Sequence, residues 1–185
     1  MDPYEQLDLM SPTLEQLVRG TRASQLGDPT PCDKFAVRDL LDHLVGGLTT
    51  FGALFRGEAP PDLDGRDVVG DDHAAAFSAA LAAFDEASRA PGAMDRTIAA
   101  PFGEVPAPVF LRFLAFDGLV HSWDLATATG QSFNPPDDLV TDVEAFARTA
   151  VAPEMRDGDT FAREVTPPAG ASLIERLVAF SGRQP

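Results

Sequence analysis

Three ionisable residues, Asp117, His121 and Asp124, lie within the predominantly apolar segment 109–128. On a helix with about 100° between successive residues, these side chains fall within about 60° of arc. Apolar residues such as Phe113 share that side, so it is expected to face the core. Because an unpaired buried charge costs several kcal/mol, the cluster needs partners. A bound metal ion is one way to stabilise it.

A third candidate ligand comes from another predicted helix, at residues 37–55. His43 lies at the edge of its apolar face, and Gly47, one turn further on, leaves space beside the imidazole. Asp117 and His121 are four residues apart, so both can reach one ion, and bundle cores combine ligands from separate helices. Two histidines and a carboxylate leave coordination positions for water or substrate. The alternative is a buried His–Asp pair that fastens two helices.

Four other residues have less specific roles. Asp124, one turn beyond His121, is expected either to orient a metal ligand from behind or to pair with an arginine or a backbone N–H. Trp123 points about 120° away from the ligand face, which favours packing or an oligomer contact. His73 is expected to be solvated. Cys32 is expected to be a buried structural thiol, since no base is identifiable beside it.

The hydrophobic pattern predicts a helical bundle. Helices are expected at residues 3–25, 37–55, 72–90, 107–129, 138–152 and 172–180, with an extended stretch at 95–106. Pro12 is expected to break, kink or restart the first helix. Gly130 closes the long helix, and the segment from Ser172 to Glu175 has a capping-box pattern. No alternation of strands and helices supports a doubly wound sheet.

Length and composition limit the classes of function. The 185 residues suit one domain, 1–185, and a net charge of −15 disfavours nucleic acids and anionic membranes as partners. No apolar run reaches the ~18 residues that span a bilayer, and the start is acidic where a signal peptide would be basic, so a cytoplasmic location is expected. With one cysteine, an internal disulfide and a multi-cysteine zinc site are excluded.

Several short motifs in combination carry a resemblance to a known family. They are Thr30-Pro31-Cys32, the segment 37–47 with His43 and Gly47, the motif Asp117-x-x-x-His121-x-Trp123-Asp124-Leu125-Ala126, and the ending Leu177-x-Ala179-Phe180-x-Gly182-Arg183-x-Pro185. Together they resemble the actinobacterial metal-binding family related to mycothiol-dependent maleylpyruvate isomerase, within the DinB-like superfamily. The resemblance spans nearly the whole chain.

The resemblance implies an all-α, DinB-like four-helix bundle with additional short helices and little or no strand. It also implies a divalent metal held by His43, Asp117 and His121. Where the isomerase has a glutamate ligand, this chain has Asp117, which is one methylene shorter. Zinc is the default ion for such ligands, with nickel or iron as alternatives.

The leading functional hypothesis is a metal- and mycothiol-dependent transferase or isomerase-like enzyme that joins a small-molecule thiol to an electrophile. Maleylpyruvate isomerase itself is disfavoured, because the resemblance implies an additional C-terminal domain and this chain ends soon after its last predicted helix. The alternative is a non-catalytic, stress-associated metal-binding bundle that acts as a homodimer. An open cleft at the metal would favour the enzyme; a closed site and an apolar surface around Trp123 would favour the dimer.

Overall fold

The structure, a computed structural model, describes residues 1–156, 158 and 161–185. In chain order its elements are α1 (Pro3–Gly20), α2 (Val37–Arg56), α3 (His73–Ser88), β1 (Thr97–Ala100), β2 (Gly103–Pro106), α4 (Ala107–Thr129), α5 (Asp137–Ala150) and α6 (Leu173–Ser181). Short 3-10 turns occur at Ala23–Gln25, Ala93–Asp95 and Pro153–Met155. The architecture is an all-α bundle, as the sequence predicts.

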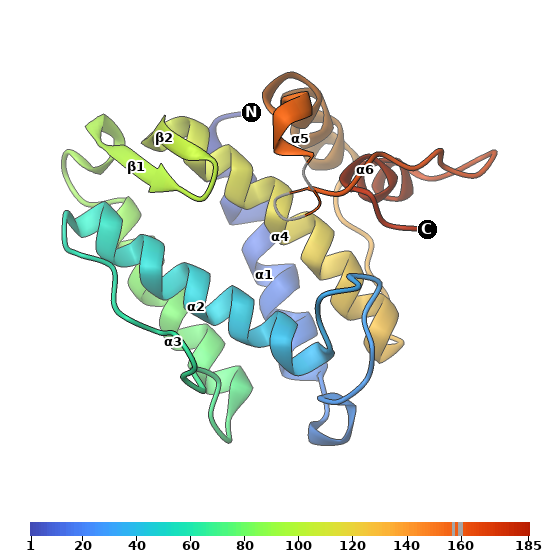
Figure 1. Cartoon of the computed structure of the whole chain (residues 1–185), viewed down its shortest axis with the longest axis horizontal. Helices are drawn as coiled ribbons and strands as arrows, with labels where there is room; N and C mark the ends of the chain where they lie inside the picture. The colour runs from blue at the N-terminus through green and yellow to red at the C-terminus, as the bar shows by residue number, and fades with distance from the viewer. Residues whose placement is uncertain (157, 159–160) are drawn as a thin grey trace.

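Helices α1 to α4 form the bundle. Helix α2 packs on α3, α1 packs on α4, and the contacts between α1 and α3 and between α2 and α4 complete the ring. Helix α4 crosses the middle of the molecule, while α5 and α6 lie together on its other side (Figure 1). Most of the side chains of α4 are buried, which confirms the central position predicted from its nearly uniform apolar sequence.

Local sequence signals explain where several helices end. Gly130 follows α4 with a φ of 70°, in the left-handed region that glycine adopts at little cost. At the start of α6, the Ser172 hydroxyl accepts a hydrogen bond from the Glu175 N–H, and the Glu175 carboxylate accepts one from the Ser172 N–H. The capping box predicted from the sequence is therefore confirmed.

Helix α1 departs from expectation at Pro12. The helix neither breaks nor restarts there, but runs without interruption from Pro3 to Gly20 and ends before the predicted residue 25. Its first turn is well capped, because the Asp2 carboxylate accepts hydrogen bonds from the N–H groups of Tyr4 and Glu5. Packing of its buried face against the other helices holds the segment helical despite the backbone hydrogen bond that Pro12 removes.

The predicted extended stretch is a small antiparallel hairpin of β1 and β2, in which Ile98 pairs with Val105. Ile98 is fully buried and belongs to the main core. Figure 1 shows the hairpin beside the start of α4, near one end of the bundle. These strands form the only sheet in the described parts of the chain.

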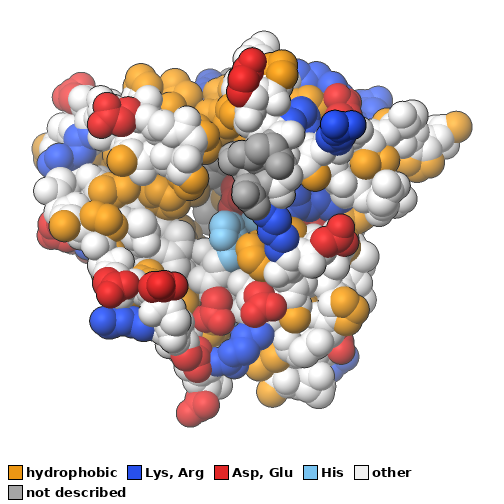
Figure 2. All heavy atoms as spheres, in the orientation of Figure 1, with side chains coloured by type: hydrophobic (Ala, Val, Ile, Leu, Met, Phe, Trp, Pro, Cys, Tyr) orange, Lys and Arg blue, Asp and Glu red, His pale blue; other side chains and the backbone are white. Residues whose placement is uncertain are grey.

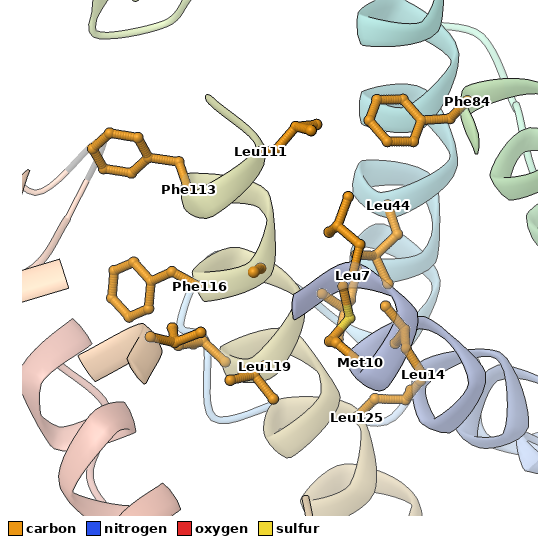
Figure 3. Packing of buried hydrophobic residues seen from close by; sticks show 14 of the residues in the cluster. Leu7, Met10, Leu14, Leu44, Phe84, Leu111, Phe113, Phe116, Leu119 and Leu125 are labelled. Atoms are coloured by element: carbon orange, nitrogen blue, oxygen red, sulfur yellow. The ribbon is translucent and has the colours of Figure 1, made fainter. Parts of the chain in front are cut away.

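The core joins α1 closely to α4. In Figure 3, Leu7, Met10 and Leu14 of α1 lie between α4 and Leu44 of α2. The two helices approach closely at Gly118, where an added Cβ would lie 2.6 Å from both the sulfur and the methyl carbon of Met10. A glycine next to Asp117 therefore allows α1 to pack tightly against the candidate ligand segment.

Within the described residues, no helix is long and apolar enough to cross a membrane.

Replacing Pro12 by alanine is expected to stabilise the protein by about 2 kcal/mol, because an exposed proline inside a helix costs ~3 kcal/mol and its loss returns ~1 kcal/mol of entropy to the unfolded chain. Urea unfolding monitored by circular dichroism measures the difference. Gln16→Ala is the matched control, since Gln16 is exposed on the same helix and should change stability by under ~0.5 kcal/mol. A destabilised Pro12→Ala variant would contradict the expectation.

Candidate metal centre

The three residues selected from the sequence converge in the structure. His43 Nε2 lies 3.6 Å from Asp117 Oδ2, and His121 Nε2 lies 3.3 Å from Asp117 Oδ1. One donor atom from each of His43, Asp117 and His121 can be chosen so that all lie within 4.8 Å of one another. The two imidazole rings meet edge to face with centroids 4.9 Å apart. This cluster could hold a metal ion.

The helices bring these side chains together because α2 and α4 are neighbours in the ring of four helices. Asp117 and His121 are separated by one turn of α4, so their side chains project from the same side. His43 projects from the first half of α2. The pairing of Phe51 with Phe110, whose ring centroids are 4.4 Å apart, shows that α2 runs antiparallel to α4, with later residues of α2 beside earlier residues of α4.

A buried carboxylate holds His121 from behind. Asp124 has no exposed surface, and its Oδ2 lies 3.0 Å from His121 Nδ1. Since an ionised carboxylate only accepts, His121 Nδ1 donates this hydrogen bond, which turns Nε2 toward Asp117. The Arg183 guanidinium donates to the same carboxylate through Nε and Nη2. Of the two roles considered for Asp124, pairing with an arginine is therefore present, while positioning a metal ligand through His121 stays a prediction.

Phe35 covers the pair of imidazoles. Its ring centroid lies 5.2 Å from that of His43 and 5.9 Å from that of His121. The loop that carries it is closed by Thr30, whose hydroxyl donates to the Phe35 carbonyl at 2.7 Å and whose N–H donates to the same oxygen at 3.2 Å. The Thr30-Pro31-Cys32 motif thus forms a fixed turn that places an aromatic ring over the cluster.

Neighbouring charges set the protonation of the cluster in the absence of metal. Burial alone would lower the pKa of His121, but the carboxylates of Asp117 and Asp124 outweigh it and raise that pKa to about 9. Burial would raise the pKa of Asp117, but the positive charge of His121 and the close approach of the His121 and His43 imidazoles hold it well below its usual range. An Asp117 carboxylate therefore faces a cationic His121 at neutral pH.

The cluster opens into a cavity of about 1010 Å³ between the four bundle helices. Figure 2 shows a histidine, in pale blue, inside a hollow in the middle of this face, with hydrophobic surface beside it. The side chains of His43 and Asp117 are 41% and 42% exposed, whereas that of His121 is 6% exposed. The cluster is therefore anchored on a buried imidazole and accessible from the side of the other two residues.

The donor set fits a divalent ion. His121 Nε2 and His43 Nε2 lie 3.3 and 3.6 Å from different oxygens of Asp117, and one donor atom from each residue can be chosen so that all lie within 4.8 Å of one another. Asp117 reaches both imidazoles even though it is one methylene shorter than a glutamate. A carboxylate behind one histidine is also a common arrangement at metal sites, as Asp124 is here.

The structure also places Gly47, Cys32 and His73, whose surroundings were predicted from the sequence. Gly47 lines the cavity one turn from His43, as predicted. Cys32 is not buried: it is partly exposed and lines the same cavity, because the turn at Thr30 holds it at the rim. His73 is not simply solvated, since its Nε2 lies 3.0 Å from the carbonyl oxygen of Thr21, which follows α1.

Sequence reasoning missed two functional contacts. Phe35 precedes α2 by two residues in a loop without periodicity, so nothing in the local pattern indicates what its ring covers. Arg183 appeared only as one letter of the C-terminal motif, and its partner Asp124 is 59 residues away. The available signal was the fully apolar setting of Asp124, which requires a cationic partner from some other part of the chain.

Comparison with known proteins identifies a matching family model and two similar proteins. The family model described as the mycothiol maleylpyruvate isomerase N-terminal domain matches residues 8–126, a span that includes His43, Asp117, His121 and Asp124. Two proteins from Mycobacterium tuberculosis strains CDC 1551 and H37Rv, both described as uncharacterized, are 39% identical over 184 residues, covering 99% of this chain and 98% of theirs. No solved structure matches significantly.

The raised pKa of His121 predicts how stability depends on pH once metal is removed with a chelator. The folded state holds the His121 proton more tightly than the unfolded chain, so this contribution is complete below about pH 6.5 and is lost as pH rises through about 9. The free energy of unfolding should fall over that window by no more than about 3 kcal/mol.

Urea unfolding of the metal-free protein at a series of pH values measures this slope. Because other groups also titrate, the relevant quantity is the difference from His121→Gln, which keeps a polar side chain but cannot gain the proton. An identical slope in the two proteins would show that His121 does not carry the effect.

Proposed function

The chain belongs to the mycothiol maleylpyruvate isomerase N-terminal domain family, and from this membership and the geometry we propose that it is a metal- and mycothiol-dependent transferase or isomerase-like enzyme. The observation that carries the proposal is the position of the cluster: three potential ligands converge at the wall of a large cavity, with two of them still accessible. His43, Asp117 and His121 would hold the ion.

Zinc suits this donor set best, because two imidazoles and one carboxylate are common zinc ligands. Nickel and iron also bind such ligands. A bound ion would supply a Lewis acid with a coordination position left for a thiol, which it would hold as the thiolate at neutral pH.

The chain itself positions the ligands and limits access of water. Asp124 lies against His121 Nδ1 and orients the imidazole, and Arg183 holds the Asp124 carboxylate in place. Phe35 shields one side of both imidazoles. Other titratable residues also line the cavity, among them Cys32, Lys34 and Arg183. We assign none of them the role of base, and the thiol proton passes to solvent.

The thiol could take part in either of two reactions, a transfer or an isomerisation. In a transfer, the sulfur forms a bond to an electrophilic carbon and a leaving group departs with its bonding electron pair. In an isomerisation, the sulfur adds to a carbon–carbon double bond and the adduct rotates about the resulting single bond. The carbon–sulfur bond then breaks, which restores the double bond in the other geometry and releases the thiol unchanged.

The alternative, a non-catalytic metal-binding dimer, has less support. That hypothesis calls for a closed site, whereas His43 and Asp117 open into the cavity. It also calls for an apolar surface around Trp123, but this side chain is partly buried and packs against the core. Dimerisation itself stays a prediction.

The purified protein is expected to contain about one divalent ion per chain, and replacing His43 or His121 by alanine should reduce the content to under about a tenth of that. Elemental analysis by mass spectrometry measures it. His73→Ala is the matched control, because His73 contacts the backbone near α1 and lies outside the cluster. If the two cluster variants keep full metal content while they remain folded, the ligand assignment is wrong.

Mycothiol is expected to bind at the metal as its thiolate. Adding it to protein loaded with cobalt in place of zinc should produce a sulfur-to-cobalt charge-transfer band, because direct coordination mixes sulfur and metal orbitals. S-methylated mycothiol is the matched control, since it keeps the rest of the molecule but has no ionisable thiol. Binding of mycothiol without the band would contradict activation by the metal.

A further inference from the structure

The cavity continues well beyond the cluster into an apolar arm. We define the arm by six residues that line the cavity: Leu48, Phe51, Leu81, Phe102, Phe113 and Leu114. They come from α2, α3, α4 and the turn between β1 and β2. Along α2, Phe51 lies eight residues beyond His43, which corresponds to roughly 12 Å along the helix axis. The arm thus starts beside the cluster and leads toward the end of the bundle that carries the hairpin.

Most side chains of the arm remain partly exposed although they belong to the core region. Leu48, Phe51, Phe102 and Leu114 keep intermediate exposure while they pack against buried neighbours, and their accessible surface lines the cavity. Aromatic contacts fix the walls, with centroids 4.5 Å apart for Phe102 and Phe113. Concave, preformed apolar surface of this kind is typical of small-molecule sites, because a ligand that covers it removes that surface from water.

Charge is distributed unevenly along the cavity. The two basic residues among its described lining residues are Lys34 and Arg183, and both belong to the end that contains the cluster. Lys34 adjoins Phe35, and Arg183 binds Asp124. The α1 and α3 walls instead contribute carboxylates, among them Glu15 and Asp85. An anionic group placed in the arm would lose its hydration without gaining a cationic partner.

From these observations we infer that the arm binds an uncharged hydrophobic group, aromatic or long-chain alkyl, of the electrophilic substrate whose reactive carbon lies at the cluster. The reaction in this assignment rests on the proposed function. The class of substrate rests only on the residues that line the arm. It excludes substrates that would place a second carboxylate roughly 12 Å from the metal end, where no lining residue could pair with it.

Gly47 provides a way to block the arm selectively. It lines the cavity between His43 and Phe51, and an added Cβ would make only an ordinary contact, 3.9 Å from the Phe51 ring. Gly47→Leu therefore fits at its Cβ and extends into the passage. The neighbouring Gly46 is the matched control, because it lies outside the cavity and an added Cβ would approach only Leu63, at 3.8 Å. The two variants carry the same side chain on the same helix.

The test uses the full-length protein as purified and the neutral fluorescent probe N-phenyl-1-naphthylamine, which needs neither thiol nor reaction. We expect Gly47→Leu to weaken probe binding by about tenfold or more, and Gly46→Leu to change it by less than about twofold. Metal content should be the same in both variants. Equal binding by wild type and Gly47→Leu, equal losses in the two variants, or no probe binding by wild type would overturn the assignment.

Competition then tests the charge preference. Decanoate and decanedioate have the same length, but the second must place a carboxylate in the arm when its other carboxylate lies at the cluster end. Decanoate should displace the probe about tenfold more effectively than decanedioate, and equal displacement would overturn the inference. These results are independent of the cobalt experiment: probe binding without the charge-transfer band would refute thiol activation alone, and the reverse result would refute the arm alone.

Discussion

The structure depends on the burial of one carboxylate. Asp124 has no contact with solvent, and it is stable there only because His121 and Arg183 satisfy it from two sides. This triad connects three otherwise separate features: the ligand face of α4, the C-terminal segment beyond α6, and the orientation of the imidazole that anchors the cluster. Removing any member would leave a buried charge without its partner, so the fold and the candidate site share the same interaction.

The helices of the bundle could be predicted from the sequence because each is specified by local residues. The long apolar helix, its glycine end and the capping box of α6 depend on residues within a few positions of one another. The candidate ligands could also be predicted, since the spacing of Asp117 and His121 fixes their common face and His43 lies at the edge of the apolar face of its helix beside Gly47. The expected break or restart at Pro12 was wrong because helix packing outweighed a local preference.

The remaining features depend on contacts between distant segments. Whether Phe35 covers the imidazoles, or Arg183 reaches Asp124, is decided by how a loop and the C-terminal segment pack on the bundle, and no periodicity records it. The cavity likewise depends on how several helices pack together and not on any one segment. Leu48 and Phe51 have the sequence signature of ordinary core residues, and only the separation of the helices determines that part of their surface stays open.

The position of Arg183 also constrains the order of events during biosynthesis. It is translated 59 residues after Asp124, when α4 and both histidines of the cluster have already been made. Until α6 and the segment behind it leave the ribosome, the Asp124 carboxylate has no Arg183 guanidinium beside it, and its contact with His121 on the same helix is the only part of the triad that can form. The nascent chain therefore carries all three candidate ligands before the triad of His121, Asp124 and Arg183 is complete.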